Sequence, residues 1–448
     1  MRFVRTALTL AMALAAPVAW SADLVEVFDM AYASDPTLQA AEATRYSVAE
    51  GSVQARSRLL PQITGSYSWS NTDSESVQTS LDVESTPSTR DADSRDLRLR
   101  LDQTIYDRAN YTQLAGARAN AARAEADYDA AVDSLMMRTT EAYFAVLTAQ
   151  DGLAFAVAQE KAVRRQLDQA EQRFEVGLSA ITDVHEAQAR ADQSRASAIL
   201  AQNDVDDALQ ALEEIAGQPV SGLKRLRTDL NMGPPEPAVP DDWVQQAMNS
   251  SPSLKAREFQ LEGANHAVET AKAGHYPTLS AFVTYSDNDT TGDRTFAGIP
   301  GSADSADERT TIGITLNVPI YSGGATQSGV RQAVYDREAA IDNVEAERRA
   351  VNRSIRNAYR AVIAGISEVQ ARKQALVSAQ SALEATEAGF EVGTRTIVDV
   401  LLSQQTLFQA QRDDSQARHN LVLNRLRLNQ ASGTIEADDL RKINALLQ

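Results

Sequence analysis

The chain contains no cysteine, which excludes several classes of protein at once. Without thiols it cannot be a disulfide scaffold, a thiolate zinc protein, a cysteine hydrolase or a lipoprotein acylated through an N-terminal cysteine. Histidine is also scarce, and the four residues His185, His266, His275 and His419 have no metal-ligand spacing. We therefore expect no metal site and no bound cofactor.

Basic residues are in the minority, with 43 Lys and Arg against 61 Asp and Glu in 448 residues, a formal net charge of -18. No dense Lys/Arg cluster occurs, and this argues against nucleic acid as a partner because phosphate binding depends on such clusters. The lack of a nucleophile elbow, P-loop, HExxH or paired-histidine motif argues against an enzyme. Length alone would suggest about three domains, at roughly 150 residues each.

The first residues have the pattern of a secretory signal peptide. Arg2 and Arg5 precede a short apolar run and small residues, and we predict a signal peptide over residues 1–21, with cleavage after Ser21 or Ala22. The apolar run is well under the ~20 residues that a membrane-spanning helix needs. No later stretch approaches that length, so a mature chain that enters a membrane must do so as strands.

The chain repeats itself with a period of 216 residues, which replaces the estimate of three domains. Phe174-Glu175-Val176-Gly177 aligns with Phe390-Glu391-Val392-Gly393, and Asp183-Val184 aligns with Asp399-Val400. The mature protein is therefore predicted to be two copies of one elongated unit. We expect a first repeat over residues 22–230, a proline-rich connector over 231–242, a second repeat over 243–435 and a C-terminal tail over 436–448.

Proline is absent between Pro87 and Pro219 and after Pro319, and both stretches are rich in strong helix formers. Gly177 and Gly393 each interrupt one stretch. We predict two pairs of long helices, over residues 108–176 with 182–216 and over residues 324–392 with 396–432. The first helix of each pair would be ~100 Å long at ~1.5 Å per residue, which no single globular core matches.

Small and apolar residues form a seam along these helices. Steps of three and four from Val184 reach only such residues, which indicates closely packed, coiled-coil-like helices. The seam consists of Ala187, Ala191, Ser194, Ala198, Ala201, Val205, Ala208, Leu212 and Ile215. On the helices alone, an ordinary soluble helical bundle is an open alternative.

Four other segments alternate apolar and polar residues, as strands with one apolar face do. We predict strands over residues 62–70, 96–106, 278–286 and 310–321, which fit a transmembrane barrel wall. A half-buried sheet on a soluble core would look similar, but seldom comes with such long helices. The polar segments between paired strands, residues 71–96 and 287–309, are expected to be long loops. Outer-membrane barrels have their long loops outside, so the helices are expected on the periplasmic side.

Four strands cannot close a barrel, because the smallest outer-membrane barrels have about 8 strands and lipid does not tolerate open edges. Two copies would supply about 8 strands, three about 12 and four about 16, and side chains fill an 8-stranded barrel. For a conduit, three or more copies are therefore favoured. Arg98 and Arg100 fall on the polar face of their strand, where we expect them to line the lumen and to tune ion selectivity.

Two strings of residues resemble the TolC family of outer-membrane efflux proteins. They are Asn317-Val318-Pro319-Ile320-Tyr321-Ser322-Gly323-Gly324 and Phe390-Glu391-Val392-Gly393-Thr394-Arg395-Thr396-Ile397-Val398-Asp399-Val400-Leu401. The Ser-Asp-Pro region near the mature N-terminus and Leu60-Pro61-Gln62 are similar too, and the resemblance covers residues 22–435. It implies a mainly α-helical protein with transmembrane β-strands, a homotrimer with one barrel of about 12 strands and a periplasmic α-helical tunnel.

The resemblance also implies function, partners and location. The chain would be a porin-like duct in the outer membrane of a Gram-negative bacterium, with its helices in the periplasm. A periplasmic adaptor (membrane fusion) protein and an inner-membrane transporter of the RND or ABC type would dock on it, for multidrug efflux, type I protein secretion or both. The alternative from a different class is a barrel-anchored structural or adhesive coiled-coil protein, which would need no gate.

The same resemblance implies a gate at the periplasmic helix tips that opens like an iris. Gly177 and Gly393 would form the turns at the tips, and Asp399 would line the entrance as a three-fold ring of carboxylates, which attracts cations. Four further residues of this chain match family positions whose polar links hold the coils closed. These are Thr182, Asp183, Arg395 and Arg418.

Two positions depart from the family pattern at this gate. Leu402 stands where the family has a second acid, so we expect weaker block by multivalent cations. Phe390 stands where a tyrosine is frequent, so a hydroxyl-mediated latch to Asp183 is lost. For every gate residue the alternative interpretation is a solvated helix end.

Overall fold

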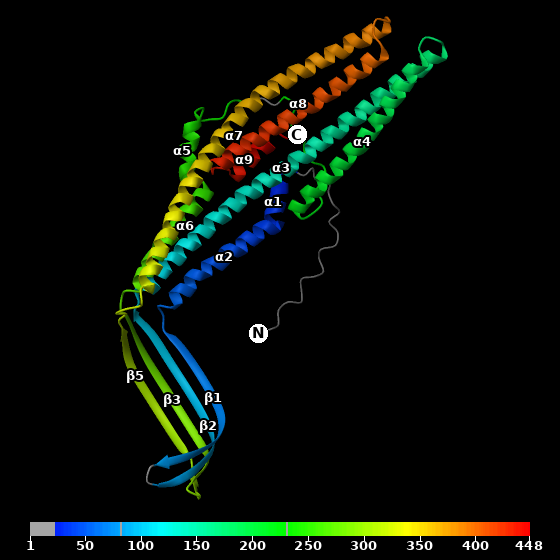
Figure 1. Cartoon of the computed structure of the whole chain (residues 1–448). Helices are drawn as coiled ribbons and strands as arrows, with labels where there is room; N and C mark the ends of the chain where they lie inside the picture. The colour runs from blue at the N-terminus through cyan, green and yellow to red at the C-terminus, as the bar shows by residue number, and fades with distance from the viewer. Residues whose placement is uncertain (1–22, 81–82, 230–231) are drawn as a thin grey trace, which may run out of the picture. The chain divides into compact units, whose positions relative to one another are not determined.

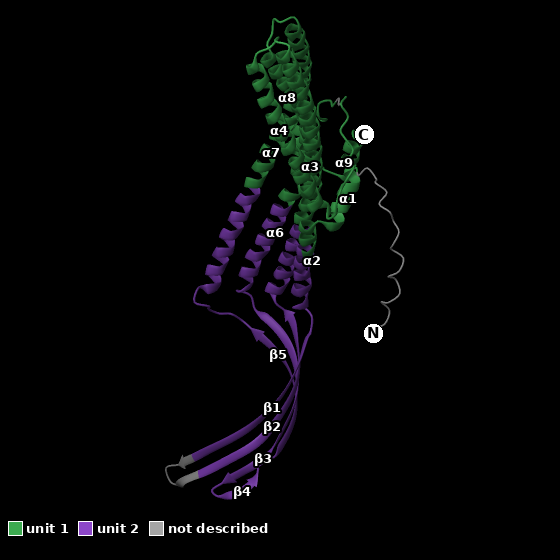
Figure 2. Cartoon of the chain, turned by 90° about the vertical axis from the view of Figure 1, so that its right-hand side faces the viewer, with its two compact units in different colours: residues 1–43, 126–255, 346–448 green, residues 44–125, 256–345 purple. Residues whose placement is uncertain are grey.

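The computed structural model describes residues 23–80, 83–229 and 232–448, so the predicted signal peptide lies outside the described residues. The described chain is mainly helical with one antiparallel sheet, as predicted (Figure 1). It divides into two compact units (Figure 2). Unit 1 holds Met1–Ala43, Ala126–Lys255 and Ala346–Gln448, and unit 2 holds Thr44–Glu125 and Ala256–Glu345.

Four long helices account for almost half of the chain: α3 (Arg108–Glu175), α4 (Ile181–Ala216), α7 (Ala325–Glu391) and α8 (Ile397–Ala431). Sequence analysis did not identify the shorter helices α1 (Leu24–Ser34), α2 (Pro36–Ser57), α5 (Pro240–Ser250), α6 (Pro252–Ala273) and α9 (Ala437–Asn444). Three of them begin at a proline, where the missing N–H costs no helical hydrogen bond. In the part of the chain that the structure describes, no helix is both long and apolar enough to cross a membrane.

Unit 2 contains the sheet, in the order β1 (Gln62–Ser80), β2 (Val83–Tyr106), β3 (Thr278–Phe296) and β5 (Ser305–Asn317), all antiparallel. A short strand, β4 (Ile299–Ser302), pairs with the end of β3. The four helix ends within unit 2 meet the sheet at one end, and the hairpin turns lie at the other (Figure 2).

The strands are longer than predicted, and the expectation of long loops at residues 71–96 and 287–309 was wrong. Most of these residues continue the strands, with Asn71 paired to Asp93 and Asp289 paired to Ala306. The backbone ladder needs no apolar side chains, whereas apolar alternation was the signal used to find strands. β5 in turn ends at Asn317 instead of residue 321, shortly before Pro319, which has no N–H to donate to a ladder.

One face of the sheet is apolar and exposed. Six of its side chains are at least 60% exposed: Ile63, Tyr67, Trp69, Ile312, Ile314 and Leu316. From Ile63 to Trp69 this band is ~20 Å tall at ~3.3 Å per residue, close to the ~25 Å apolar band of outer-membrane barrels. In water an apolar patch of this kind would normally be covered by protein, so the face suits contact with lipid.

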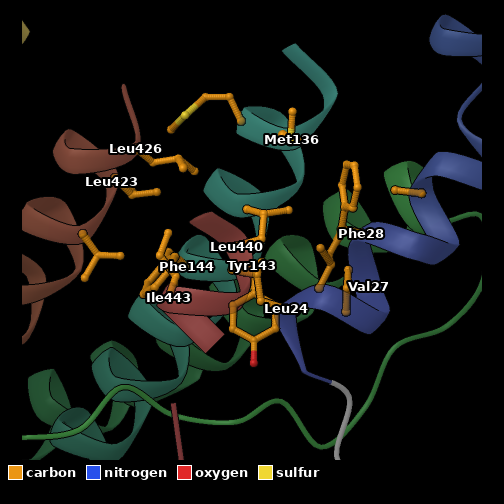
Figure 3. Packing of buried hydrophobic residues seen from close by; sticks show 14 of the residues in the cluster. Leu24, Val27, Phe28, Met136, Tyr143, Phe144, Leu423, Leu426, Leu440 and Ile443 are labelled. Carbon is orange, nitrogen blue, oxygen red and sulfur yellow. The ribbon is translucent and has the colours of Figure 1, made fainter. Parts of the chain in front are cut away.

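Unit 1 has its main hydrophobic core where α1 and α9 pack with α3, α4 and α8 (Figure 3). Leu24, Tyr143 and Leu440 are almost completely buried there. The tail residue Leu447 pairs with Leu226 through an isolated β-bridge. The predicted C-terminal tail is therefore part of the core.

The two halves of the chain make the same closing contact, 216 residues apart. The hydroxyl of Ser34, at the end of α1, donates to the carbonyl of Ala216 at the end of α4 (2.8 Å). The hydroxyl of Ser250, at the end of α5, donates to the carbonyl of Ser432 after α8 (2.7 Å). Glycine follows each of these carbonyl residues, with positive φ in both cases.

Gly433→Ala is expected to destabilise the protein by about 2 kcal/mol. At Gly433 φ is +67°, and a Cβ would lie 2.7 Å from Ser251 Cα, so both backbone strain and a backbone clash oppose the alanine. The control is Gly51→Ala in α2, where a Cβ meets nothing within 4 Å and alanine should stabilise by about 0.5–1 kcal/mol. Thermal unfolding followed by circular dichroism measures both changes, and equal midpoints for the two variants would contradict the assignment.

Candidate functional site

The two helix hairpins of unit 1 end in turns of the same geometry. Gly177, between α3 and α4, has φ +76°, and Gly393, between α7 and α8, has φ +80°. The N–H of Leu178 donates to the carbonyl of Arg173 (2.7 Å), and the N–H of Thr394 donates to the carbonyl of Gly389 (2.8 Å). Both hydrogen bonds run from residue i+5 back to residue i, as in the Schellman motif at a helix C-terminus. This motif requires a residue in the left-handed backbone conformation, which glycine adopts most readily. The two glycines predicted at the hairpin tips are therefore turn residues.

Asp183 and Asp399 occupy the same position in the first turn of α4 and α8, and each caps its helix. Oδ2 of Asp399 accepts hydrogen bonds from the N–H and the hydroxyl of Thr396, both at 2.9 Å. Oδ2 of Asp183 accepts from the hydroxyl of Ser179 (2.6 Å) and the N–H of Ala180 (3.3 Å). The Thr-Ile-Val-Asp sequence is a capping-box pattern that sequence analysis could have found.

The cap affects the charge of Asp399. The hydrogen bonds that Thr396 donates, first from its backbone and then from its hydroxyl, hold the pKa of Asp399 below its usual range, and Arg395 adds to the effect. Donors aimed at a carboxylate favour its charged form. Asp399 is therefore an anion at neutral pH.

The hairpins pack against each other near their tips. Ile397 and Leu401 of α8 are buried against Ala170 of α3 and against Ala187 and Ala191 of α4. The predicted seam of α4 is confirmed at six of its positions, which are buried: Ala187, Ala191, Ser194, Ala198, Val205 and Leu212. Small side chains let the helices approach closely at this junction.

Phe390 joins the two hairpins. Its ring belongs to the apolar contacts of both α3/α4 and α7/α8, and the guanidinium carbon of Arg173 lies 4.9 Å from the ring centroid. A cation–π contact of this kind contributes about 0.5–1 kcal/mol at an exposed site. Sequence analysis missed Arg173, because a contact between residues so far apart in the chain leaves no local pattern.

The other predicted gate residues are not gathered in one place. Leu402 and Thr182 are exposed, and Arg395 contacts Gly389 beside the turn. Arg418 lies ~28 Å further along α8 than Asp399 at ~1.5 Å per residue, and it pairs with Asp414 (3.1 Å). Among the described residues, no hydrogen bond or ion pair links Thr182 or Asp183 to the α7/α8 hairpin.

Arg98 and Arg100 lie on the polar face of the sheet in unit 2. Arg98 faces Ser66 and Ser286 across the ladder, and Arg100 faces Thr64 and Thr284. Each arginine has an aspartate two residues away on its own strand: Arg98 lies 3.5 Å from Asp96, and Arg100 lies 2.7 Å from Asp102. Both are exposed on the face opposite the apolar band.

A buried polar cluster joins α3 to α8 deeper in unit 1. His419 is 3% exposed; its Nδ1 lies 2.8 Å from the Thr148 hydroxyl and its Nε2 lies 3.9 Å from the Asp151 carboxylate. Ser415 donates to the same carboxylate. Burial lowers the pKa of His419 to about 4, although Asp151 acts in the opposite direction. The imidazole is thus neutral at physiological pH.

Long helical hairpins in one chain with a sheet that exposes an apolar face define the class of outer-membrane channel subunits. Comparison with known proteins agrees: the family model described as "Outer membrane efflux protein" matches residues 27–218 and 243–434. The chain belongs to this family. The predicted TolC-family resemblance, export function and outer-membrane location are confirmed.

Individual relatives cover nearly the whole chain. The outer membrane protein TolC of Vibrio cholerae serotype O1 is 37% identical over 96% of this chain and 94% of its own length. The alkaline protease secretion protein AprF of Pseudomonas aeruginosa is 27% identical over 95% of this chain and 88% of its own. The crystal structure of VceC from Vibrio cholerae superposes with a TM-score of 0.74 at 20% identity, covering 92% of this chain and 96% of that one. Two of these relatives are named as outer membrane proteins and one as a secretion protein.

The neutral buried histidine predicts an acid-sensitive contact between α3 and α8. Between pH 6.5 and about 4 the unfolded chain binds a proton at His419 that the folded chain does not bind, so stability falls as pH falls through this window. The loss should be on the order of 2–3 kcal/mol at pH 4. His419→Gln, which cannot titrate, should lose less of its thermal midpoint than the wild type when pH is lowered from 7.5 to 4.5. An identical pH dependence in the two proteins would exclude His419 as the source.

Proposed function

We propose that three copies of this chain form an export duct with one barrel of about 12 strands. The observation that carries the proposal is a sheet with an exposed apolar face and two outer strands, β1 and β5, each paired on one side only among the described residues. Because lipid offers no hydrogen-bond partner, these edges need partners from other copies. Three copies leave a lumen, whereas two would give a barrel that side chains fill.

The proposed duct receives its cargo in the periplasm from an adaptor protein and an inner-membrane pump of the RND or ABC type. The family to which the chain belongs, and a relative named as a secretion protein, support this assembly. The arrangement performs no chemistry itself, so the pump would supply both the energy and the choice of cargo. Drugs and polypeptides are both compatible with such a passive conduit.

We further propose that the hairpin tips form the gate. Gly177 and Gly393 end the hairpins in matching turns, and the ionised Asp399 stands in the first turn of α8. Three copies would bring three such carboxylates to the entrance, where they attract cations. The apolar contacts around Phe390 and its contact with Arg173 would hold the two hairpins of one chain together in the closed state.

The orientation of the duct can be tested with single cysteines, because the chain has none of its own. Leu178→Cys lies beside the Gly177 turn and Ile299→Cys lies at the β-hairpin end, and both positions are 70% exposed. A membrane-impermeant maleimide should label Ile299→Cys on intact cells and Leu178→Cys only after the outer membrane is permeabilised. Labelling of Leu178→Cys on intact cells would instead support the adhesive coiled-coil alternative.

The charge of the gate can be tested by conductance in planar bilayers. Asp399→Ala should weaken block by Mg²⁺ added on the helical side by about tenfold, because it removes the ring of carboxylates. Thr396→Ala is the matched control, since it removes the hydroxyl from the helix cap but keeps the Asp399 carboxylate and the backbone N–H that contributes most to its low pKa. Equal changes in the two variants would assign the effect to the cap and not to the charge.

A further inference from the structure

Charged residues in the sheet separate by face. Side chains alternate between the two faces along a strand, so the pairing register assigns each one. The apolar face continues towards the hairpin turns with eight acidic residues and one arginine: Asp73, Glu75, Asp91, Asp93, Asp287, Asp289, Asp293, Glu308 and Arg95. Among residues with described side chains, the polar face holds five arginines and three aspartates: Arg90, Arg98, Arg100, Arg294, Arg309, Asp96, Asp102 and Asp307. The polar face is therefore cationic although the whole chain is acidic.

Three of the five arginines are neutralised on their own strands. Arg98 and Arg100 pair with Asp96 and Asp102 as described, and Arg309 lies 3.5 Å from Asp307. Sequence analysis did not single out Arg309, which shares a row with Arg98 across Ser286. Among the residues whose side chains the structure describes, these three pairs account for all the carboxylates that the strands contribute to this face. The excess positive charge is thus at the other two arginines.

Arg90 of β2 and Arg294 of β3 lie directly opposite each other, near the hairpin turns. Both side chains are exposed, and within the described chain neither guanidinium has an ion pair or a hydrogen bond. Like charges directly opposite each other on neighbouring strands destabilise a sheet. The native sheet keeps this pair, so a benefit outside the sheet's own stability is expected.

The row beside this pair is closely packed. Ala92, which is 3% exposed, faces Gly292 there, and a Cβ on Gly292 would lie 2.2 Å from the carbonyl oxygen of Asp91, so only small residues fit between the strands. Asp304, just before β5, accepts a hydrogen bond from the N–H of Gly292 and forms no ion pair with either arginine within the described chain. Two adjacent guanidinium groups without a counter-charge present several donors suited to a phosphate or carboxylate group.

We propose that Arg90 and Arg294 form a binding site for multivalent oxyanions, such as oligophosphates or polycarboxylates. The inference rests on the proposed trimeric duct, in which the polar face lines the lumen and three copies bring six guanidinium groups together near the end opposite the helices. The acidic residues of the other face point outwards and do not cancel this field in the lumen. The trimer then carries a cationic ring on this face of the sheet, near the β-hairpin turns, and an anionic ligand binds there.

The proposal is tested with inorganic triphosphate and the purified full-length protein. Triphosphate should block single-channel current in planar bilayers more strongly when it is added on the side of the β-hairpin turns than when it is added on the side of the helices. The Arg90→Gln/Arg294→Gln double variant should raise the half-blocking concentration by about tenfold, because both guanidinium groups are lost. Arg95→Gln is the matched control, since Arg95 lies on the same strand but on the opposite face. Triphosphate should block this variant at the same concentration as the wild type.

A second measurement separates this proposal from the duct itself. Isothermal titration of triphosphate into the detergent-solubilised protein should show binding that the double variant loses and Arg95→Gln keeps. A protein that conducts but is blocked equally in all variants would overturn the anion site and leave the duct intact. If the protein does not conduct at all, the duct proposal is wrong. The titration would then still show whether Arg90 and Arg294 bind triphosphate. Loss of the like-charge pair should not impair folding of the double variant.

Discussion

A strand that crosses lipid must have every backbone N–H and C=O group hydrogen-bonded within the protein, because hydrocarbon offers no partner. In this chain β1 and β5 each have one ladder complete and one edge open among the described residues. Their apolar side chains are exposed in the single chain as well. The sheet of another copy would meet both needs at once, which is the physical reason for the proposed trimer.

The duplication explains how one chain supplies matching parts to such an assembly. Turns at Gly177 and Gly393, capping acids at Asp183 and Asp399, and serine contacts at the ends of α4 and α8 all recur at the same spacing. A tube of quasi-equivalent hairpins needs equal lengths and equal turns. The copies differ at the acid–cap pairs of the two tips, where Asp399 accepts from the hydroxyl of Thr396 and Asp183 accepts from the hydroxyl of Ser179.

Sequence patterns predicted the long helices, their seam and the apolar strand face, because each depends on a local period. They did not predict the extent of the strands, since the Ser-, Thr- and Asp-rich ends of β1 and β2 pair through the backbone without apolar alternation. The contact of Arg173 with Phe390 and the Arg90–Arg294 pair join residues distant in sequence. Only the register of the folded chain brings such residues together, and no local pattern encodes it.

The hydrogen bonds of the helix cap favour the charged form of Asp399, which the proposed gate requires. Three carboxylates brought together at the entrance of the proposed trimer would raise one another's pKa, and a protonated ring would lose its attraction for cations. The hydrogen bonds from Thr396 act in the opposite direction and hold the pKa of Asp399 low before any assembly forms. A residue in the first turn of α8 is thereby also held in its charged form, so the capping interpretation is compatible with the proposed gate, which requires that charge.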